Sequence, residues 1–233
     1  MPAPDIVWWA ALAKKLNILA LLTYLVPSAV GLWRWSGLVP AYRPLVWLVV
    51  GPGFLLGLAS EIGRYVFHNN IAPQHLITLT ETLVLGWAYW YALHSARNRR
   101  FLMGALGGFI VVFGVESVYW RGFWQGYNTY AHTFQTFVLL ALALLYFEQL
   151  LQELHTSRLE HDPMFLVSVG TMLYYAGTIM VFLLEDGMQH RHQTDQLWAM
   201  FSIQATLLIV FNGFLTLALW NAHRAPQVSK ALL

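Results

Sequence analysis

The sequence predicts an all-α fold: a polytopic membrane protein built as a bundle of seven transmembrane helices. Hydrophobic residues make up 58% of the chain and charged residues only 10%. The apolar residues form about seven blocks, each near the ~20 residues that a helix needs to cross a bilayer. Because backbone N–H and C=O groups in lipid must pair within the protein, blocks of this length are expected to be helices.

The predicted transmembrane domain covers residues 16–221, between an interfacial segment at 1–15 and a short cytoplasmic tail at 222–233. The interfacial segment alternatively forms the first turns of span one. Two polar stretches, 154–162 and 185–196, are expected to be loops. The seven spans are placed at 16–35, 42–67, 74–94, 101–120, 130–152, 163–184 and 197–220.

Prolines support these limits. Proline is tolerated in the first turn of a helix, but inside a helix it removes a hydrogen bond and causes a kink. Pro27 and Pro52 fall inside predicted spans and predict kinks there. The prolines at or near predicted helix starts are Pro40, Pro44, Pro73 and Pro163.

The composition excludes several classes of function. The net charge of +2 is too small to indicate a nucleic-acid partner. The absence of cysteine excludes thiol nucleophiles, Cys–metal sites and disulfides. No lysine lies in a predicted span, so a retinal Schiff base is excluded and no cofactor is predicted; the lysines are Lys14, Lys15 and Lys230. No histidine pair lies mid-membrane for a haem, although His75 with His132 could hold one near the outer surface.

The distribution of positive residues predicts the orientation. With seven spans the termini lie on opposite faces, and the face that carries residues 97–100 has the larger share of Lys and Arg. The positive-inside rule then places the N-terminus outside and the C-terminus in the cytoplasm of a multi-pass protein of the inner (plasma) membrane. The N-terminal face carries Lys14, Lys15, Arg64, Arg121 and Arg191, and the other face carries Arg34, Arg43, Arg97, Arg99, Arg100, Arg158, Arg224 and Lys230.

A weak internal repeat links two pairs of spans. In one pair Phe54 is followed seven residues later by Glu61, and in the other Phe109 is followed at the same spacing by Glu116. The pattern indicates one helix followed by three outward-opening hairpins, and chance similarity between apolar helices is the alternative. The entrances of the next spans are also alike, with Asn70 and His75 in one case and Asn128 and His132 in the other.

Glutamates within the predicted spans carry most of the functional information, because a charge at the bilayer centre costs from ~3 to over ~10 kcal/mol. Glu148 lies near the cytoplasmic end of its span and is assigned no role. Glu61, Glu81 and Glu116 lie toward the outer side and are expected to face a shared polar region. The neighbours expected at the same depth are Arg64, Thr78, Tyr119, Asn128, His132 and Gln135.

Helical spacing pairs several of these side chains, since residues three apart share a face. Glu61 and Arg64 form such a pair, so Glu61 is expected to be ionised. Glu81 has no arginine within helical reach and is expected to be protonated or hydrogen-bonded to Thr78, Gln135 or His132. The polar residues of spans six and seven are interpreted as packing contacts between helices: Tyr174, Tyr175, Gln204 and Asn212.

The polar residues leave three interpretations open: a hydrogen-bond network that clamps helices, a ligand or ion site in an outward-facing cavity, and a catalytic metal site. The metal site would use His75, His132 and Glu81, and it requires that the entrances of spans three and five be adjacent. Neither an HExxH motif nor another ligand-spaced histidine pair occurs within a predicted helix. His190 and His192, with Glu185, Asp186 and Asp195, are interpreted as a solvated loop, with weak metal or proton sensing as the alternative.

Several residues follow one another in a consistent order along the spans: Glu61, Asn70, Glu81, the stretch 128–151, Pro163, Met164, Phe165, Gly170, Tyr174, Gly177, Leu197 and Trp198. In this order the chain resembles a group of uncharacterised bacterial seven-helix membrane proteins, some associated with sensor histidine kinase systems. The resemblance implies a sensory or accessory role with the C-terminus inside, and it supplies no catalytic residues. The chain departs from the group in its aromatic composition and its His-rich loop.

The expected function is that of a receptor-like or sensory protein with a small or lipid-like ligand in an outward-facing pocket. The expected partners are the lipid bilayer and a separate signalling protein on the cytoplasmic face, with a homo-oligomer left open and nucleic acid excluded. The alternatives are an intramembrane metal-dependent hydrolase and a small transporter. The expected ligand-binding residues are Glu61, Glu81, Glu116, His132, Asn128, Gln135, Tyr119 and Arg64.

Overall fold

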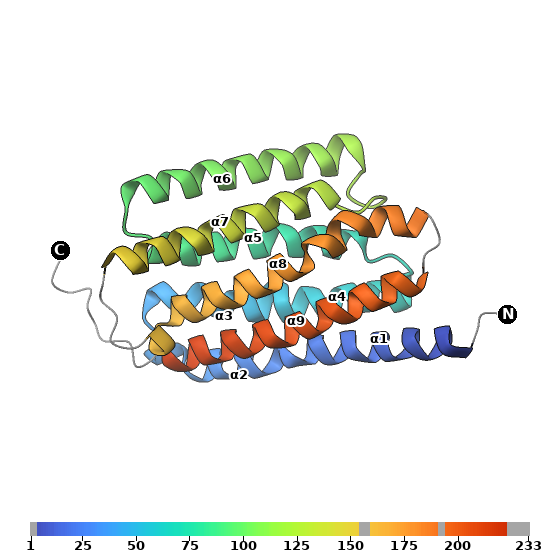
Figure 1. Ribbon diagram of the computed structural model, residues 1–233, viewed down its shortest axis with the longest axis horizontal. Helices are drawn as coiled ribbons and strands as arrows, with labels where there is room; N and C mark the ends of the chain where they lie inside the picture. Colours follow the sequence, from blue (N-terminus) through green and yellow to red (C-terminus); the bar gives the residue numbers. More distant parts are fainter. Residues whose placement is uncertain (1–3, 154–158, 191–193, 223–233) are drawn as a thin grey trace.

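The computed structural model describes residues 4–153, 159–190 and 194–222, and every regular element within these ranges is a helix (Figure 1). The all-α expectation is therefore confirmed for the described residues. A long helix, or a run of helical segments that continue one another without a loop, is called a rod below. The described chain forms seven such rods, which run up and down along one axis (Figure 1).

The first rod breaks where proline predicts a kink. It consists of α1 (Pro4–Thr23) and α2 (Leu25–Trp33), with a turn at Tyr24 between them. Pro27 has no N–H to donate to the carbonyl of residue 23, so the helix loses a hydrogen bond at this point. The continuous course of α1 from Pro4 favours residues 4–15 as the first turns of this rod.

The second rod changes helix type at its own proline. It runs through α3 (Arg43–Leu48), η3 (Val49–Leu56), α4 (Gly57–Ile62) and η4 (Gly63–Phe67). Both η3, which contains Pro52, and η4 are π-helical. A π-helical turn shifts the hydrogen-bond pattern by one residue and is frequent at functional sites.

The remaining rods match the predicted spans to within a few residues at most ends. The expectation of a loop over 185–196 is wrong at both of its ends, because the helix of span six continues to His190 and that of span seven begins at Thr194. Residues 185–190 include no proline, and Glu and Gln are good helix formers, so polarity alone did not end the helix. The elements are α5 (Ile71–Ala92), α6 (Ala96–Val115) with η5 (Glu116–Trp120), α7 (Thr129–Glu153), α8 (Pro163–His190) and α9 (Thr194–Asn221), and three short turns are η1 (Trp35–Gly37), η2 (Pro40–Tyr42) and η6 (Leu159–His161).

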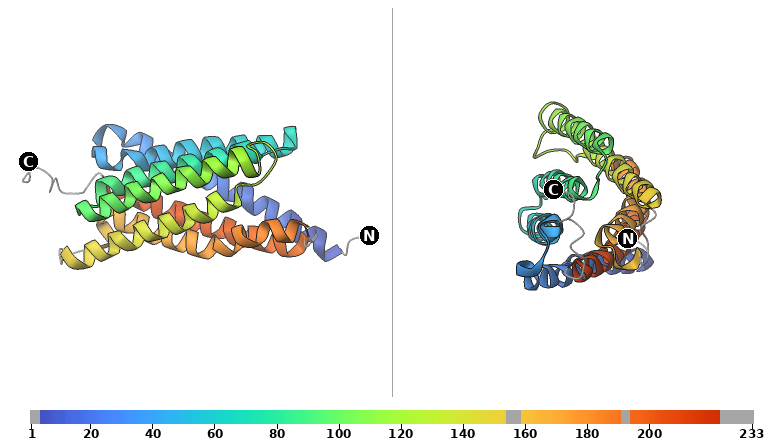
Figure 2. Two further views of the ribbon diagram at one scale, coloured as in Figure 1. Left: turned by 90° about the horizontal axis from the view of Figure 1, so that it is seen from above. Right: turned by 90° about the vertical axis from the view of Figure 1, so that its left-hand side faces the viewer.

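Six of the rods form a ring, and the α6–η5 rod lies outside it (Figure 2). The first rod, α1 and α2, contacts α9, and α8 lies between α9 and α7. On the other side of the ring, α7 contacts α5, and α5 contacts the second rod. Contacts of the second rod with α2 close the ring. The α6–η5 rod packs on the outside against α7 and α5. The end of the bundle where α1 begins is called the Pro4 end, and the other end, where α6 begins, the Arg97 end (Figure 1).

Five segments of the described chain are long and apolar enough to cross a membrane, which supports a multi-pass membrane protein. The expected spans three and six are not among them, and in α8 a shorter apolar stretch, Pro163–Ile179, is found. The first candidate begins at Ala10, so Lys14 and Lys15 both lie inside it, contrary to the expectation that every lysine is outside the spans. The five segments are Ala10–Trp33, Pro40–Phe67, Ala96–Trp120, Thr129–Gln152 and Leu197–Asn221.

The outer surface of the bundle is apolar. Large hydrophobic side chains that are more than half exposed occur on most rods, while hydroxyl, amide and carboxyl side chains are buried between rods. This distribution suits a surface in contact with lipid, where exposed apolar groups cost nothing. Examples of the exposed residues are Trp33, Leu55, Val111, Phe137, Leu144 and Leu217.

Candidate functional site

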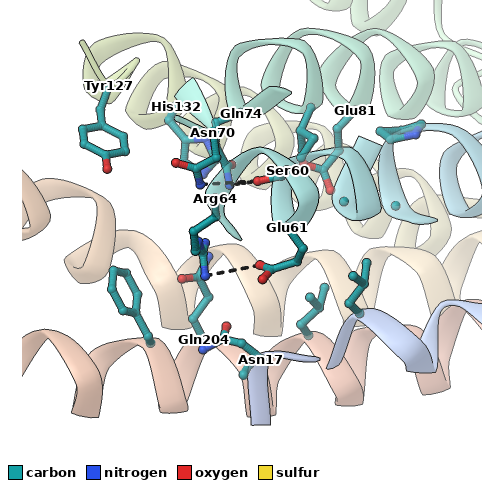
Figure 3. A pocket seen from close by; sticks show the side chains of 18 of the residues that line it. Asn17, Ser60, Glu61, Arg64, Asn70, Gln74, Glu81, Tyr127, His132 and Gln204 are labelled. Atoms are coloured by element: carbon teal, nitrogen blue, oxygen red, sulfur yellow. Dashed lines mark hydrogen bonds and ion pairs between the residues drawn. The ribbon is translucent and has the colours of Figure 1, made fainter. Parts of the chain in front are cut away.

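A cavity of about 510 Å³ lies inside the ring, toward the Pro4 end. Among the described residues, every rod of the ring contributes to its lining and the α6–η5 rod does not. The volume is within the range of small-molecule sites, ~300–1,000 Å³. Figure 3 shows polar side chains of α1, α4, α5, α7 and α9 around it.

An ion pair stands in the cavity wall at the end of the second rod. Nη1 of Arg64 lies 3.2 Å from Oε1 of Glu61, as the i,i+3 spacing predicted (Figure 3). The side chains are 43% and 19% exposed, so water reaches this pair and weakens it. Beside it, Ser60 accepts hydrogen bonds from the amides of Gln74 (3.0 Å) and Asn70 (3.4 Å), which fixes the start of α5 against α4.

Deeper in the cavity, α5 and α7 are joined by the polar residues that the sequence singled out. Nε2 of Gln135 donates to Oε2 of Glu81 at 3.2 Å, which is one of the partners expected for Glu81. One turn closer to the Pro4 end, Oγ1 of Thr78 lies 3.0 Å from Nδ1 of His132. Asn128 donates to the same Thr78 oxygen at 2.7 Å. Glu81, His132 and Asn128 line the cavity, whereas Gln135 is fully buried behind it.

Aromatic side chains line the cavity together with Glu81. Tyr24, at the break between α1 and α2, and Tyr174, on α8, both line the cavity, and Tyr175 follows on α8. Tyr24 and Tyr174 share the cavity lining with Glu81, and the Tyr175 hydroxyl lies 3.4 Å from Nε2 of Gln135, which also bonds Glu81. Tyr174 and Gln204, interpreted from sequence as packing contacts, both belong to the cavity wall.

Two expected members of the site lie elsewhere. Glu116 is fully buried at the end of the α6–η5 rod, where its carboxylate accepts the backbone N–H groups of Tyr130 (3.0 Å) and Ala131 (2.6 Å). It therefore caps the N-terminus of α7. Nε of Arg121 lies 3.9 Å from Oε1 of the same carboxylate. Tyr119 is 82% exposed on the outside of the bundle. Both positions follow from the exclusion of their rod from the ring.

The candidate metal ligands do not gather at one point. His75 is fully buried, with Nδ1 3.0 Å from the Ser117 hydroxyl and Nε2 2.9 Å from the carbonyl of Gly126, so it bonds α5 to the α6–η5 rod and its loop. His132 and Glu81 make the separate contacts given above. No group of three His, Asp or Glu side chains that could hold a metal is found within the part of the chain that the structure describes. The side chains of His190, His192, Glu185, Asp186 and Asp195 lie outside the described residues.

Sequence reasoning missed several residues of the cavity wall. Asn17 and Tyr24 come from the first rod, and Tyr127 comes from the loop before α7. Tyr24 lies three residues before Pro27, so a search for polar groups beside predicted kinks would have found it. Asn17 is an amide in the apolar stretch that follows Lys15, so a search for isolated amides within spans would have found it. The other lining residues that were not singled out for the site include Ser60, Gln74, Trp198 and Phe201.

A comparison with known proteins finds no match to this chain among protein families, characterised proteins or solved structures. The resemblance to bacterial seven-helix membrane proteins stays a prediction.

Proposed function

We propose that this protein is a receptor-like membrane protein of seven spans that binds a small ligand in the cavity of the ring. The observation that supports this most is the cavity itself, because ionisable, amide and aromatic side chains from six rods line it together. A ligand that contacts all six rods at once would bind best to one arrangement of them and would shift the bundle toward it. The shift would be read by a separate protein at the Arg97 end.

Charge supports the proposed orientation. The rods alternate in direction, so α6 begins at the Arg97 end, and the arginine cluster 97–100 lies there. Under the positive-inside rule the Arg97 end faces the cytoplasm, and the cavity, toward the Pro4 end, opens outward. In this arrangement α5 and α8 complete the seven spans.

The native chain has no cysteine, which allows a direct test of topology. Single cysteines are placed at two exposed loop positions, Gln125→Cys at the Pro4 end and Ser95→Cys at the Arg97 end. A membrane-impermeant maleimide added to intact cells should label Gln125→Cys and leave Ser95→Cys unlabelled until the membrane is opened. A reporter active only in the periplasm, fused after Leu233, should be inactive. The reverse pattern would overturn the orientation.

Water access to the cavity is tested in the same way. Gln74 lines the cavity, and Leu76, two residues further along α5, is partly exposed on the outside of the bundle. A small charged thiosulfonate added from outside should modify Gln74→Cys and not Leu76→Cys, because the reagent needs water. An unreactive Gln74→Cys would show a closed interior and would contradict the proposal of an outward-facing site.

One observation favours a small transporter as the second candidate. Buried polar groups continue from the cavity toward the Arg97 end: Gln135 lies 3.4 Å from the Tyr175 hydroxyl, and Tyr89 lies 3.1 Å from Ser168. Thr171, fully buried, is one turn of α8 from both Tyr175 and Ser168. A second polar access route on the cytoplasmic side is a requirement of transport. Thiosulfonate labelling of Ser168→Cys from the cytoplasmic side would favour transport over reception.

A further inference from the structure

The charges that line the cavity do not balance. Nη1 of Arg64 lies 3.2 Å from Oε1 of Glu61, so the positive charge of this lining arginine is paired with Glu61. Glu81 makes no ion pair within the described ranges, and its residue surface is only 7% exposed. On the first rod, Lys14 lies over the ring of Trp198. Lys14 and Lys15 are ten and nine residues before Tyr24, which lines the cavity, and this is about 14–15 Å along α1. His68 and His132 also line the wall, where Nδ1 of His132 lies 3.0 Å from Oγ1 of Thr78.

A carboxylate buried in this way is stable in the ionised form only beside a cation, and otherwise it takes up a proton. The cavity in front of Glu81 therefore has room for a positively charged group that the protein itself does not provide. A cationic ligand would supply this group.

The surroundings of Glu81 select the kind of cation. Tyr24 and Tyr174 line the cavity beside it, and Phe201 lies on the α9 wall. The ring of Tyr174 is held in place by stacking on Phe211, with centroids 5.5 Å apart. Aromatic faces attract ammonium groups through the ring quadrupole, most strongly where water is excluded. A bare metal ion would instead require several oxygen ligands, and the described residues do not group carboxylates or histidines in that way.

We infer that the cavity is a binding site for an organic ammonium compound, whose charged group pairs with the Glu81 carboxylate between Tyr24 and Tyr174. The cavity of about 510 Å³ is much larger than the ammonium group alone, so the ligand carries an apolar body toward Phe201 and Trp198. The Glu61–Arg64 pair lies nearer the mouth, where it offers hydrogen bonds to polar groups at the ligand's outer end. This inference rests on the proposed function, since it names the ligand class of the same cavity.

The test measures binding of three probes of similar size and different charge to the full chain in an uncharged detergent. The probes are 2-phenylethylammonium, the neutral 3-phenylpropan-1-ol and the anionic 3-phenylpropanoate. Thermal unfolding and quenching of tryptophan emission report binding. The ammonium probe should raise the unfolding temperature saturably, and the other two should do so at least about tenfold more weakly, a difference of about 1.4 kcal/mol.

Variants separate the Glu81 contact from general effects of charge. Glu81→Gln should weaken ammonium binding at least about tenfold, because it removes the charge and keeps the shape. Glu148→Gln, on an exposed part of α7, should leave binding unchanged. If Glu81→Gln fails to fold, Tyr174→Leu takes its place, with Tyr174→Phe as its matched control. Leu should weaken ammonium binding and Phe should keep it, because Phe retains the aromatic face.

The outcomes distinguish this inference from the proposed function. If the neutral or anionic probe binds as well as the ammonium probe, and the cavity-filling Gln74→Trp abolishes this binding, the inference is overturned and the receptor proposal stands. The same holds if no probe binds while Gln74→Cys is accessible to the thiosulfonate. If no probe binds and Gln74→Cys is also unreactive, both fail. Equal binding to the native chain and to Glu81→Gln would also overturn the inference.

Discussion

The segment from Gly53 to Asn70 and the segment from Gly108 to Asn128 can be compared position by position. Each carries a glutamate seven residues after a Gly-Phe pair, and each rod ends at the Pro4 end in a π-helical turn, η4 in one case and η5 in the other. Local sequence therefore leads to similar local structure. The side chain of Asn69 donates to the carbonyl of Trp124 at 3.1 Å, so the two ends also contact each other.

The two glutamates nevertheless do different things. Glu61 belongs to a rod of the ring, so it faces the cavity and pairs with an arginine that water reaches. Glu116 belongs to the peripheral rod, so it faces the start of α7 and holds two backbone N–H groups in a fully buried position. The comparison shows that the surroundings, and not the motif, decide whether an intramembrane carboxylate is available to a ligand.

The largest effect should come from Glu116→Gln. An amide has one acceptor oxygen in place of two and directs its NH2 group at a backbone donor, so one of the two N–H groups of α7 loses its partner. We expect a loss of about 2–3 kcal/mol in the free energy of unfolding, measured in detergent by denaturant titration. A smaller loss than that of Glu61→Gln would contradict the capping role.

Gly63→Ala should be the next largest. A Cβ atom at Gly63, the first residue of η4, would lie 2.7 Å from the carbonyl oxygen of Asn69, a backbone atom with little freedom to move. We expect a cost of about 1–3 kcal/mol from overpacking. Gly114→Ala, in the peripheral rod two residues before η5 begins, is the matched control, because nothing lies within 4 Å of its Cβ position. It should be neutral or stabilising by up to about 1 kcal/mol, and equal losses in both variants would argue against the tight end of η4.

Glu61→Gln should cost less, about 0.5–1 kcal/mol, because the exposed Arg64 regains water when it loses its partner. A double-mutant cycle with Arg64→Gln in the same unfolding assay measures the pair directly. A coupling energy well above about 1 kcal/mol would mean that the pair is desolvated, and Glu61 would then resemble Glu116 more closely than the exposed fractions indicate.

The smallest effect on stability is expected for Glu81→Gln. The substituted amide keeps the size of the carboxyl group and can still accept the hydrogen bond from Gln135, so the change should stay within about 1 kcal/mol. Thermal unfolding of Glu81→Gln and Glu61→Gln side by side tests the order. If Glu81→Gln is the more destabilising of the two, Glu81 is an ionised structural anchor and the roles assigned to the two residues are reversed.

Much of the site was predictable from helical spacing. The Glu61–Arg64 pair, the hydrogen bond of Glu81 to Gln135, and the contact between Thr78 and His132 follow from residues three apart on rods whose entrances lie at the same depth. The breaks at Tyr24 and around Pro52 follow from proline chemistry.

By itself, the sequence determined the class of the protein, the course of its helices and the small set of polar residues that the bundle must accommodate. The physical reason is that a bilayer requires long apolar helices and penalises each buried charge, and both requirements can be read residue by residue. Only the tertiary structure decided that the α6–η5 rod lies outside the ring. It therefore decided that Glu116 caps α7, that Tyr119 faces outward, and that Tyr24 and Tyr174 join Glu81. An apolar helix in lipid is hydrophobic on all sides, so its sequence holds no amphipathic stripe to show which side faces its neighbours.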